Sequence, residues 1–194
     1  MKRIGVLALQ GAFIEHIGML NRLGAEATPI RLPEELEGLD GLVIPGGESI
    51  TIGKLMEAYD LTGRVQKLIA DGLPVMGTCA GMILLANQVA DLNGYSLRVM
   101  DISVRRNAFG RQVDSFETDL AVPAIGETPF HAVFIRAPWI ENVGPGVEIL
   151  ARLADGTPVA AKAGNTIVAA FHPELTDDTR LHAYFLGIVN NRKQ

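Results

Sequence analysis

The chain contains one cysteine, Cys79, among its 194 residues. A single thiol excludes an intramolecular disulfide and a metal cage of several cysteines, so we expect a reducing compartment and no metal site. An excess of positive charge is also missing, because 17 Lys and Arg stand against 22 Asp and Glu, for a net charge of −5. Since no basic cluster is interleaved with aromatic residues, we expect no nucleic-acid partner.

The chain has no long hydrophobic run either. Its basic start is followed by a short apolar segment, residues 4–9, which Gln10 interrupts. That segment is too short for a signal peptide, and nothing elsewhere approaches the length that spans a bilayer. We therefore expect a cytoplasmic protein with no membrane partner. With 48% apolar and 20% charged residues, the chain has the composition of one globular domain, residues 1–194.

Strand-like and helix-like segments alternate through the first half of the chain. Residues 3–9 form a continuous apolar run of the kind buried on both faces of a parallel sheet, and apolar residues then recur at helical spacing from Phe13 to Leu23. The same patterns continue as a strand at 27–31, a strand at 41–45, helices at 51–59 and 61–69, and a strand at 74–77. This alternation predicts an α/β fold with a mainly parallel sheet.

The second half has a different pattern. From residue 95 to residue 170, short apolar or alternating runs are separated by turn signals such as Asp155-Gly156 and Gly164-Asn165. Because such dipeptides connect antiparallel strands, we expect antiparallel additions to the parallel sheet. Apolar residues at steps of three and four predict a final amphipathic helix over 181–189.

Cys79 lies in the stretch Gly77-Thr78-Cys79-Ala80-Gly81, between a strand-like and a helix-like run. This pattern is typical of the nucleophile elbow of hydrolases, with cysteine in place of serine, where small neighbours let the backbone approach closely. A thiol at a helix N-terminus is favoured as the reactive thiolate. The pentapeptide by itself fits a buried structural cysteine equally well.

The glycine pair Gly46-Gly47 follows the strand at 41–45 and could point backbone N–H groups at a ligand. A phosphate loop is excluded, because five residues rather than four separate Gly47 from Gly53, and Leu55 stands where Ser or Thr would bind magnesium. A plain turn into the next helix stays open. Ligands of such sheets bind outside the carboxyl ends of the strands, where this loop and the cysteine are both expected.

A nucleophilic cysteine needs a base, and the base needs a group that fixes its tautomer. His172 follows an apolar strand, and the proline after it predicts an extended chain in which Glu174 projects to the same side as His172. Among the other histidines, His16 and His182 lie on expected helices as surface or packing residues. His131 begins a strand and has no acid near it in the sequence.

Three separated motifs together resemble the class I, or triad, glutamine amidotransferases: the glycine loop 45–49, the elbow 77–81 and the segment 171–174. Within that class the chain is similar to the glutaminase subunits of two-component pyridoxal 5′-phosphate synthases in residues 5–12, 106–117 and 134–138. The resemblance spans essentially the whole chain. It implies a flavodoxin-like three-layer sandwich with a mainly parallel central sheet and antiparallel additions in the second half.

The resemblance also implies a role for each site residue. Cys79 would attack the side-chain amide of L-glutamine, His172 would move the thiol proton to the leaving ammonia, and Glu174 would align the imidazole. The backbone N–H groups of Gly47 and Ala80 would form the oxyanion hole. Substrate binding is expected from Gly47, Glu48, Ser49, Arg106, Ile135 and Arg136. No cofactor is implied.

The implied partner is a (β/α)8-barrel synthase that makes pyridoxal 5′-phosphate from a pentose phosphate, a triose phosphate and ammonia. Ammonia released into water is soon protonated, so the glutaminase is expected to dock on the synthase and deliver ammonia through a channel. Gln10 would lie near the oxyanion hole and the docking face. Partner binding is therefore expected to organise the hole and raise activity.

Three other functions remain compatible with the sequence. A glutaminase subunit serving another synthase, such as imidazole glycerol phosphate synthase, would keep the triad but should lack the stretch 106–117. A sensor on the same fold could use Cys79 as an oxidisable thiol, although the presence of His172 and Glu174 argues against it. A cysteine peptidase is disfavoured by a recognition set suited to a single amino acid.

Overall fold

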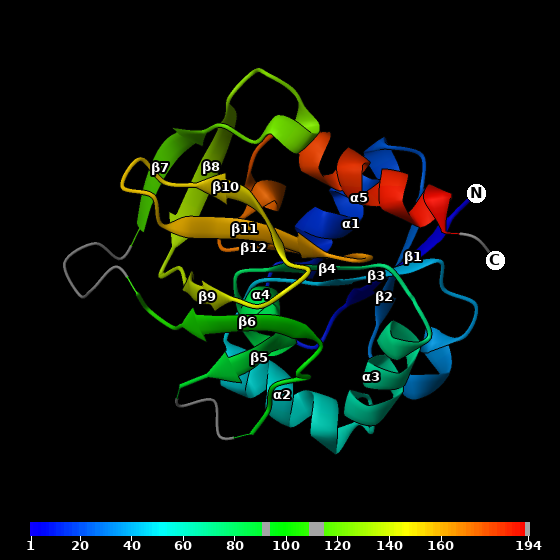
Figure 1. Ribbon diagram of the computed structural model, residues 1–194. Helices are drawn as coiled ribbons and strands as arrows, with labels where there is room; N and C mark the ends of the chain where they lie inside the picture. The colour runs from blue at the N-terminus through cyan, green and yellow to red at the C-terminus, as the bar shows by residue number, and fades with distance from the viewer. Residues whose placement is uncertain (91–93, 109–114, 193–194) are drawn as a thin grey trace.

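A seven-stranded sheet lies at the centre of the molecule (Figure 1). The computed structural model describes residues 1–90, 94–108 and 115–192. In sheet order the strands are β10 (Glu148–Arg152), β11 (Pro158–Ala163), β12 (Thr166–Ala169), β4 (Val75–Thr78), β3 (Gly41–Ile44), β1 (Arg3–Leu7) and β2 (Glu26–Ile30). The strands from β12 to β2 are parallel, whereas β10 and β11 are antiparallel additions at one edge.

Helices cover both faces of this sheet. Strands β3, β4 and β12 are buried along their whole length, as continuous apolar runs are when both faces are covered. One face carries α1 (Phe13–Arg22) and α5 (Arg180–Asn191), and the other carries α2 (Ser49–Ala58), α3 (Thr62–Ala70) and α4 (Ala80–Leu85) (Figure 1). The three-layer α/β fold expected from the sequence is therefore confirmed.

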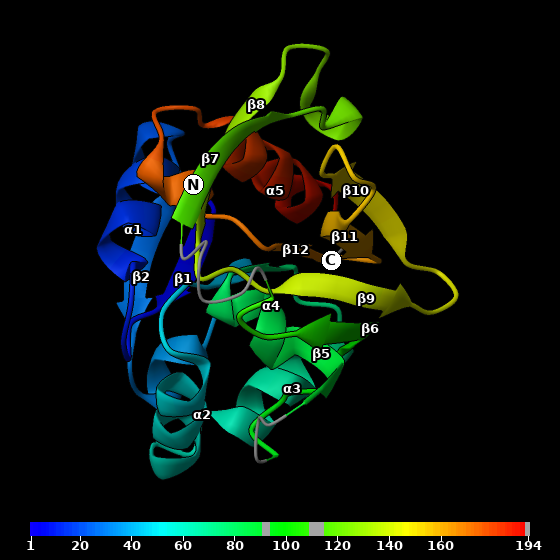
Figure 2. The same ribbon diagram turned by 90° about the vertical axis from the view of Figure 1, so that its left-hand side faces the viewer.

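Two small sheets lie on opposite sides of the central sheet (Figure 2). One consists of β5 (Ala86–Val89), β6 (Met100–Arg105) and β9 (Trp139–Val143), and the other is a hairpin of β7 (Ser115–Leu120) and β8 (Phe130–Ile135). Short 3-10 turns are η1 (Pro33–Leu36), η2 (Pro123–Ile125) and η3 (Pro173–Leu175). The turn signals Asp155-Gly156 and Gly164-Asn165 connect antiparallel partners, β10 with β11 and β11 with β12, as predicted.

Helix α2 begins at Ser49, two residues earlier than the sequence pattern predicted. The reason is Glu48, whose carboxylate accepts hydrogen bonds from the backbone N–H groups of Ile50 and Thr51 at the helix start. Glutamate is not among the residues preferred at this position, so the start of the helix at Ser49 could not be predicted from it. No helix within the described ranges is long and apolar enough to cross a membrane.

The order of the strands brings four loops together at the carboxyl end of the parallel strands. β12, β4, β3 and β1 are parallel neighbours, so the segments after them leave the sheet side by side at its carboxyl end. These segments carry His172, Cys79, Gly46 and Gln10, respectively. The carboxyl end of the sheet, where a ligand was predicted to bind, therefore brings together residues that lie far apart in the sequence.

The packing of the elbow against β3 depends on Gly81. A Cβ at this position would lie 2.0 Å from the carbonyl oxygen of Ile44, so the backbone would have to shift. We expect Gly81→Ala to lower the free energy of unfolding by about 1–3 kcal/mol, the usual range for overpacked sites, in urea denaturation. The control is Gly18→Ala in α1, where the new Cβ meets open space and alanine favours the helix. Equal effects of the two substitutions would contradict this account.

Candidate active site

Cys79 occupies a sharp turn between β4 and α4. Its backbone angles, φ 49° and ψ −103°, are rare for a residue with a side chain, and such strain costs about 1–3 kcal/mol. The turn is held by hydrogen bonds from the Cys79 N–H to the Ala169 carbonyl at 2.8 Å and from the Ile83 N–H to the Cys79 carbonyl at 3.2 Å. Strain of this kind favours a nucleophile over a structural cysteine, because packing alone does not require it.

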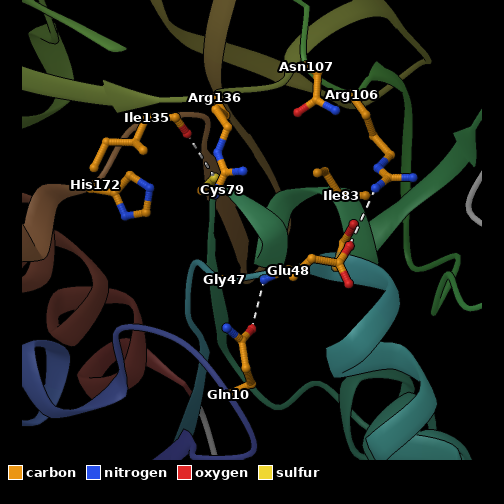
Figure 3. A pocket seen from close by; sticks show the side chains of 11 residues that line it. Gln10, Gly47, Glu48, Cys79, Ile83, Arg106, Asn107, Ile135, Arg136 and His172 are labelled. Atoms are coloured by element: carbon orange, nitrogen blue, oxygen red, sulfur yellow. Dashed lines mark hydrogen bonds and ion pairs between the residues drawn. The ribbon is translucent and has the colours of Figure 1, made fainter. Parts of the chain in front are cut away.

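His172 lies beside Cys79 (Figure 3). Glu174 holds the imidazole ring by a hydrogen bond. The ring Nδ1 donates to Glu174 Oε1 at 2.6 Å, and both residues are buried, at 7% and 5% exposure. Because Nδ1 is engaged, Nε2 is the nitrogen that remains for the thiol. The backbone differs from the extended segment predicted from the sequence: Pro173 begins the 3-10 turn η3, and the pair forms across this turn.

The surroundings of His172 favour its charged form. Burial acts against the imidazolium, but hydrogen bonding with Cys79 and Glu174 and the charge interactions with both outweigh burial and raise the pKa of His172 to about 10. The ring is therefore protonated at neutral pH. An imidazolium beside a cysteine stabilises the thiolate, which is the nucleophilic form.

The glycine loop after β3 closes the site from another side. A Cβ at Gly46 would lie 2.4 Å from His172 Cε1 and 3.3 Å from Cys79 Cβ, so a side chain there would displace the pair. In the same loop, the Glu48 N–H donates to Gln10 Oε1 at 2.7 Å, a contact drawn in Figure 3. Gln10 thus fixes the orientation of the peptide that precedes Glu48.

A pocket of about 270 Å³ opens in front of Cys79 (Figure 3). Its lining comes from loops of the central sheet, from helices α2 and α4, and from the segments at the ends of β6 and β8: Gln10, Gly47, Glu48, Ser49, Cys79, Ile83, Arg106, Asn107, Ile135, Arg136 and His172. All the site residues expected from the sequence line the pocket except two. Ala80 is the first residue of α4, and Glu174 lies behind His172.

Two lining residues, Ile83 and Asn107, were not predicted. Ile83 lies one helical turn after Cys79, so the helix expected there could have indicated it. Asn107 has a φ of 47°, which asparagine adopts more readily than most residues, and Arg136 has a φ of 42°. Cys79, Asn107 and Arg136 thus combine positive φ with a place in the pocket wall, and such strain clusters at functional sites.

Two charged side chains, Glu48 and Arg106, lie across the pocket from His172 (Figure 3). Arg106 Nη2 is 3.5 Å from Glu48 Oε1. Burial tends to raise the pKa of Glu48, but hydrogen bonds from Thr51 and Ile50, together with Arg106, lower it. Glu48 is therefore a carboxylate at neutral pH. Residues 109–114, part of the family-like stretch 106–117, lie outside the described residues.

The remaining histidines are placed as follows. His16 and His182 are both fully buried, so the packing alternative holds and the surface alternative is wrong. His131, on β8, lies 2.6 Å from Glu117 and 2.9 Å from Asp119 of β7, and these hydrogen bonds raise its pKa. These contacts were not predicted from the sequence, because both acids lie on the partner strand of the hairpin. Among the described residues no group of three or more side chains is arranged to hold a metal ion.

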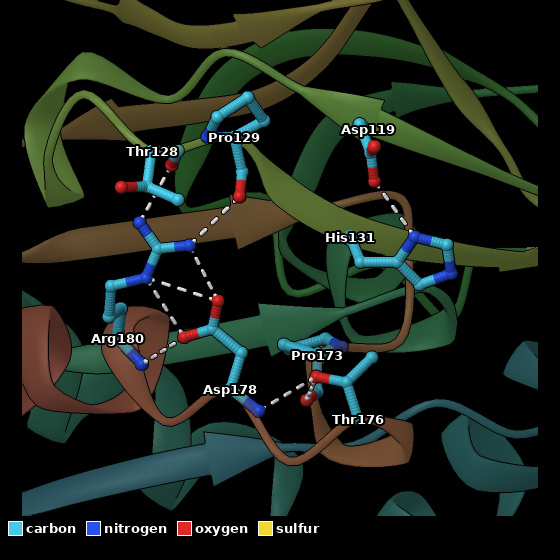
Figure 4. A network of polar contacts seen from close by, with 8 residues as sticks. All are labelled: Asp119, Thr128, Pro129, His131, Pro173, Thr176, Asp178 and Arg180. Atoms are coloured by element: carbon cyan, nitrogen blue, oxygen red, sulfur yellow. Dashed lines mark hydrogen bonds and ion pairs between the residues drawn. The ribbon is translucent and has the colours of Figure 1, made fainter.

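Arg180, at the start of α5, holds the segment that follows Glu174 (Figure 4). Its guanidinium donates to the Asp178 carboxylate at 2.6 to 3.1 Å, to the Thr128 carbonyl at 2.7 Å and to the Pro129 carbonyl at 3.0 Å. These bonds tie the turn after Glu174 to the loop before β8. The carboxylate beside His172 therefore sits on a fixed segment.

The class I glutamine amidotransferases carry a nucleophilic cysteine on this kind of sheet, and the fold places the chain among them. The chain belongs to the SNO glutamine amidotransferase family, which it matches over residues 6–191. The family expected from the sequence is therefore confirmed.

Sequence and structure comparisons with individual proteins are consistent with this family. The chain is 59% identical to the pyridoxal 5′-phosphate synthase subunit PdxT of Herpetosiphon aurantiacus, over 95% of this chain and 99% of that protein. It is 56% identical to PdxT of Corynebacterium jeikeium, over 97% of each chain. A crystal structure of a glutamine amidotransferase, 51% identical, matches the fold with a TM-score of 0.91 over 96% of this chain and 98% of its own.

Cys79 and Glu174 both act to raise the pKa of His172, which gives a direct test of their proximity. We expect Cys79→Ala to lower that pKa below about 10, because one of the two partners is lost. A pH titration of the histidine ring signals by NMR measures the change. The exposed His131 is an internal control and should titrate alike in both proteins. An unchanged pKa of His172 would show that the thiol does not interact with the ring.

Proposed function

We propose that this glutamine amidotransferase is the glutaminase subunit of a pyridoxal 5′-phosphate synthase and hydrolyses L-glutamine to L-glutamate and ammonia for vitamin B6 biosynthesis. The observation that carries the chemistry is a strained Cys79 beside a protonated His172, whose Nδ1 donates to Glu174 at 2.6 Å. The family and the PdxT relatives support the pathway.

In the first half of the reaction, the Cys79 thiolate attacks the side-chain carbonyl carbon of glutamine. The backbone N–H groups of Gly47 and Ala80 stabilise the oxyanion that forms. His172 then donates its Nε2 proton to the amide nitrogen, the carbon–nitrogen bond breaks, and ammonia leaves. A glutamyl thioester remains on Cys79.

In the second half, the neutral His172 accepts a proton from a water molecule as that water attacks the thioester carbon. The same N–H groups hold the second oxyanion. When it collapses, the carbon–sulfur bond breaks, glutamate is released, and the thiolate and imidazolium are restored. Glu174 stays ionised throughout and keeps the ring oriented.

Recognition of glutamine is proposed for the charged side of the pocket. Arg106 and Arg136 suit the α-carboxylate, since guanidinium groups bind carboxylates with two hydrogen bonds. Glu48 suits the α-ammonium group. Ser49, buried at the start of α2, and the Ile135 carbonyl, 3.9 Å from Cys79 Sγ, complete the wall. A volume of about 270 Å³ fits one amino acid better than a peptide, which disfavours the peptidase alternative.

The proposed partner is a (β/α)8-barrel synthase that uses the ammonia together with a pentose phosphate and a triose phosphate. We also propose that residues 1–194 are a single domain, since one connected hydrophobic core joins elements from β1 to α5. A cytoplasmic location is proposed on the ground that a reducing compartment keeps the one thiol free.

Ammonia release from L-glutamine tests the function. We expect release by the purified chain to rise when a barrel synthase is added, and to fall by about 10⁴-fold or more in Cys79→Ala, because the nucleophile is lost. Cys79→Ser, which keeps nearly the same shape, is the control that separates folding from chemistry. Release that persists in both variants would rule out the cysteine mechanism, and no release with or without synthase would favour the sensor alternative.

Gln10 gives a test of the oxyanion hole. Gln10→Met keeps the side-chain length but removes the oxygen that accepts from the Glu48 N–H, so the glycine loop loses its anchor. We expect the synthase-dependent rate to fall about 10- to 100-fold, somewhat less than when an oxyanion-hole donor is removed outright. Gln88→Met, at an exposed position on β5, should leave the rate unchanged. A normal rate in Gln10→Met would mean that the hole does not depend on this contact.

A further inference from the structure

Helices α1 and α5 cover one face of the sheet (Figure 1). A connected group of buried polar side chains lies between these helices and the sheet and reaches Glu174. At its centre is His16 of α1. The ring Nδ1 of His16 is 2.8 Å from His182 Nε2 on α5, and its Nε2 is 3.0 Å from Thr78 Oγ1 and 3.3 Å from Glu174 Oε2. His16, Thr78 and His182 are all fully buried. Side chains from four elements therefore meet beneath the elbow.

Only one of the two carboxylate oxygens of Glu174 bonds to His172. Oε1 accepts from His172, but Oε2 is buried and receives no well-aligned hydrogen bond from any described residue. A carboxylate in the interior is costly unless donors serve its oxygens. His16 Nε2, at 3.3 Å, is in place to be that donor.

The positions of the ring nitrogens indicate which one carries the proton. A neutral imidazole has one N–H. If His16 carried it on Nδ1, a lone pair would face the Glu174 carboxylate, and His182 would bury an Nδ1–H that meets no acceptor among the described residues. If His16 carries it on Nε2, the N–H lies between Thr78 Oγ1 at 3.0 Å and Glu174 Oε2 at 3.3 Å, and the ring accepts from His182 Nε2–H. His182 Nδ1 then has no proton and needs no acceptor.

We propose that His16, held in the neutral Nε2–H tautomer by His182, is a positioning residue that fixes the second oxygen of Glu174 and thereby the orientation of His172. The proposal rests on the glutaminase function above and adds a member to the site. The role of His16 could not be predicted from the sequence, because His16 and His182 lie on the first and last helices, far apart along the chain.

The neutral state of the inner pair follows from its environment. Burial, with His182 and His172 nearby, lowers the pKa of His16 well below its usual value, and burial lowers the pKa of His182 to about 4. Neutrality matters for the mechanism. A charged His16 would compete with the imidazolium of His172 for the same carboxylate, whereas a neutral N–H holds the carboxylate without altering the charge balance.

A first test observes the tautomers directly. The chain has four histidines, so long-range ¹⁵N–¹H correlation spectra of the ¹⁵N-labelled full chain resolve each ring. We expect His16 and His182 to be neutral at pH 7, with the proton on Nε2 in both. A proton on Nδ1 of His16, or a charged His16, would overturn the proposal.

A second test measures glutaminase kinetics with the synthase present. His16→Met fills similar space without a donor, and we expect kcat to fall about 10- to 100-fold, the usual effect of losing a residue that orients an active group. KM should change less than twofold, because His16 does not line the pocket. His16→Gln places an amide N–H near the position of Nε2 and should recover kcat to within about threefold of wild type. His131→Gln, at an exposed histidine, is the control.

The outcomes separate positioning from general structural support. Equal losses in His16→Met and His16→Gln, or a normal kcat in His16→Met, would overturn the proposal. If His16→Met does not fold, His182→Met, which leaves His16 in place but removes its orienting donor, should yield mixed His16 tautomers and a lower kcat; an unaltered His16 spectrum would count against the proposal. If wild-type ammonia release does not depend on Cys79, the proposed function fails instead, and the spectra still decide the state of His16.

Discussion

The close backbone approach at the Cys79 elbow is the constraint on which the rest of the structure depends. The turn holds a side-chain-bearing residue at positive φ, and it packs so tightly on β3 that Gly81 has no room for a Cβ. A conformation of this kind persists only where its surroundings over-determine it. Here the surroundings are β3, β4 and β12, all fully buried, and the buried helix α4. Cys79, the proposed nucleophile, therefore follows a central strand of the sheet rather than an edge strand.

The cost of burying charge is the second constraint. It determines which of the side chains behind the elbow are charged and which are neutral. Next to the pocket, His172 and Glu174 form a charged pair, whereas deeper in, His16 and His182 are neutral. Each buried charge thus has a partner, and the deeper groups contribute only hydrogen bonds. When the imidazole of His172 loses its proton in the proposed mechanism, the Glu174 carboxylate still has N–H groups beside both of its oxygens, from His172 Nδ1 and His16 Nε2.

The parts of the fold that follow from short-range patterns could be predicted from the sequence. Apolar runs gave the parallel strands, and Asp155-Gly156 gave a hairpin because its turn geometry is local. Cys79 and His172 were predictable because each lies in a motif. Contacts between distant elements were not: the acids beside His131 lie across a hairpin, and the neighbours of His16 come from three other elements. A single sequence without structure contains no signal for such meetings.

The central sheet and the small sheets contribute different groups to the site. Gln10, Cys79 and His172 follow strands of the central sheet, which is rigid because both faces are covered. Arg106 follows β6 and Arg136 follows β8, which belong to the two small sheets. The groups that need sub-ångström placement for bond making are thus on the buried sheet, where strain can be held. The two arginines proposed to bind the α-carboxylate of the substrate thus follow strands of the small sheets, whereas Glu48, proposed to bind the α-ammonium group, follows β3 of the central sheet.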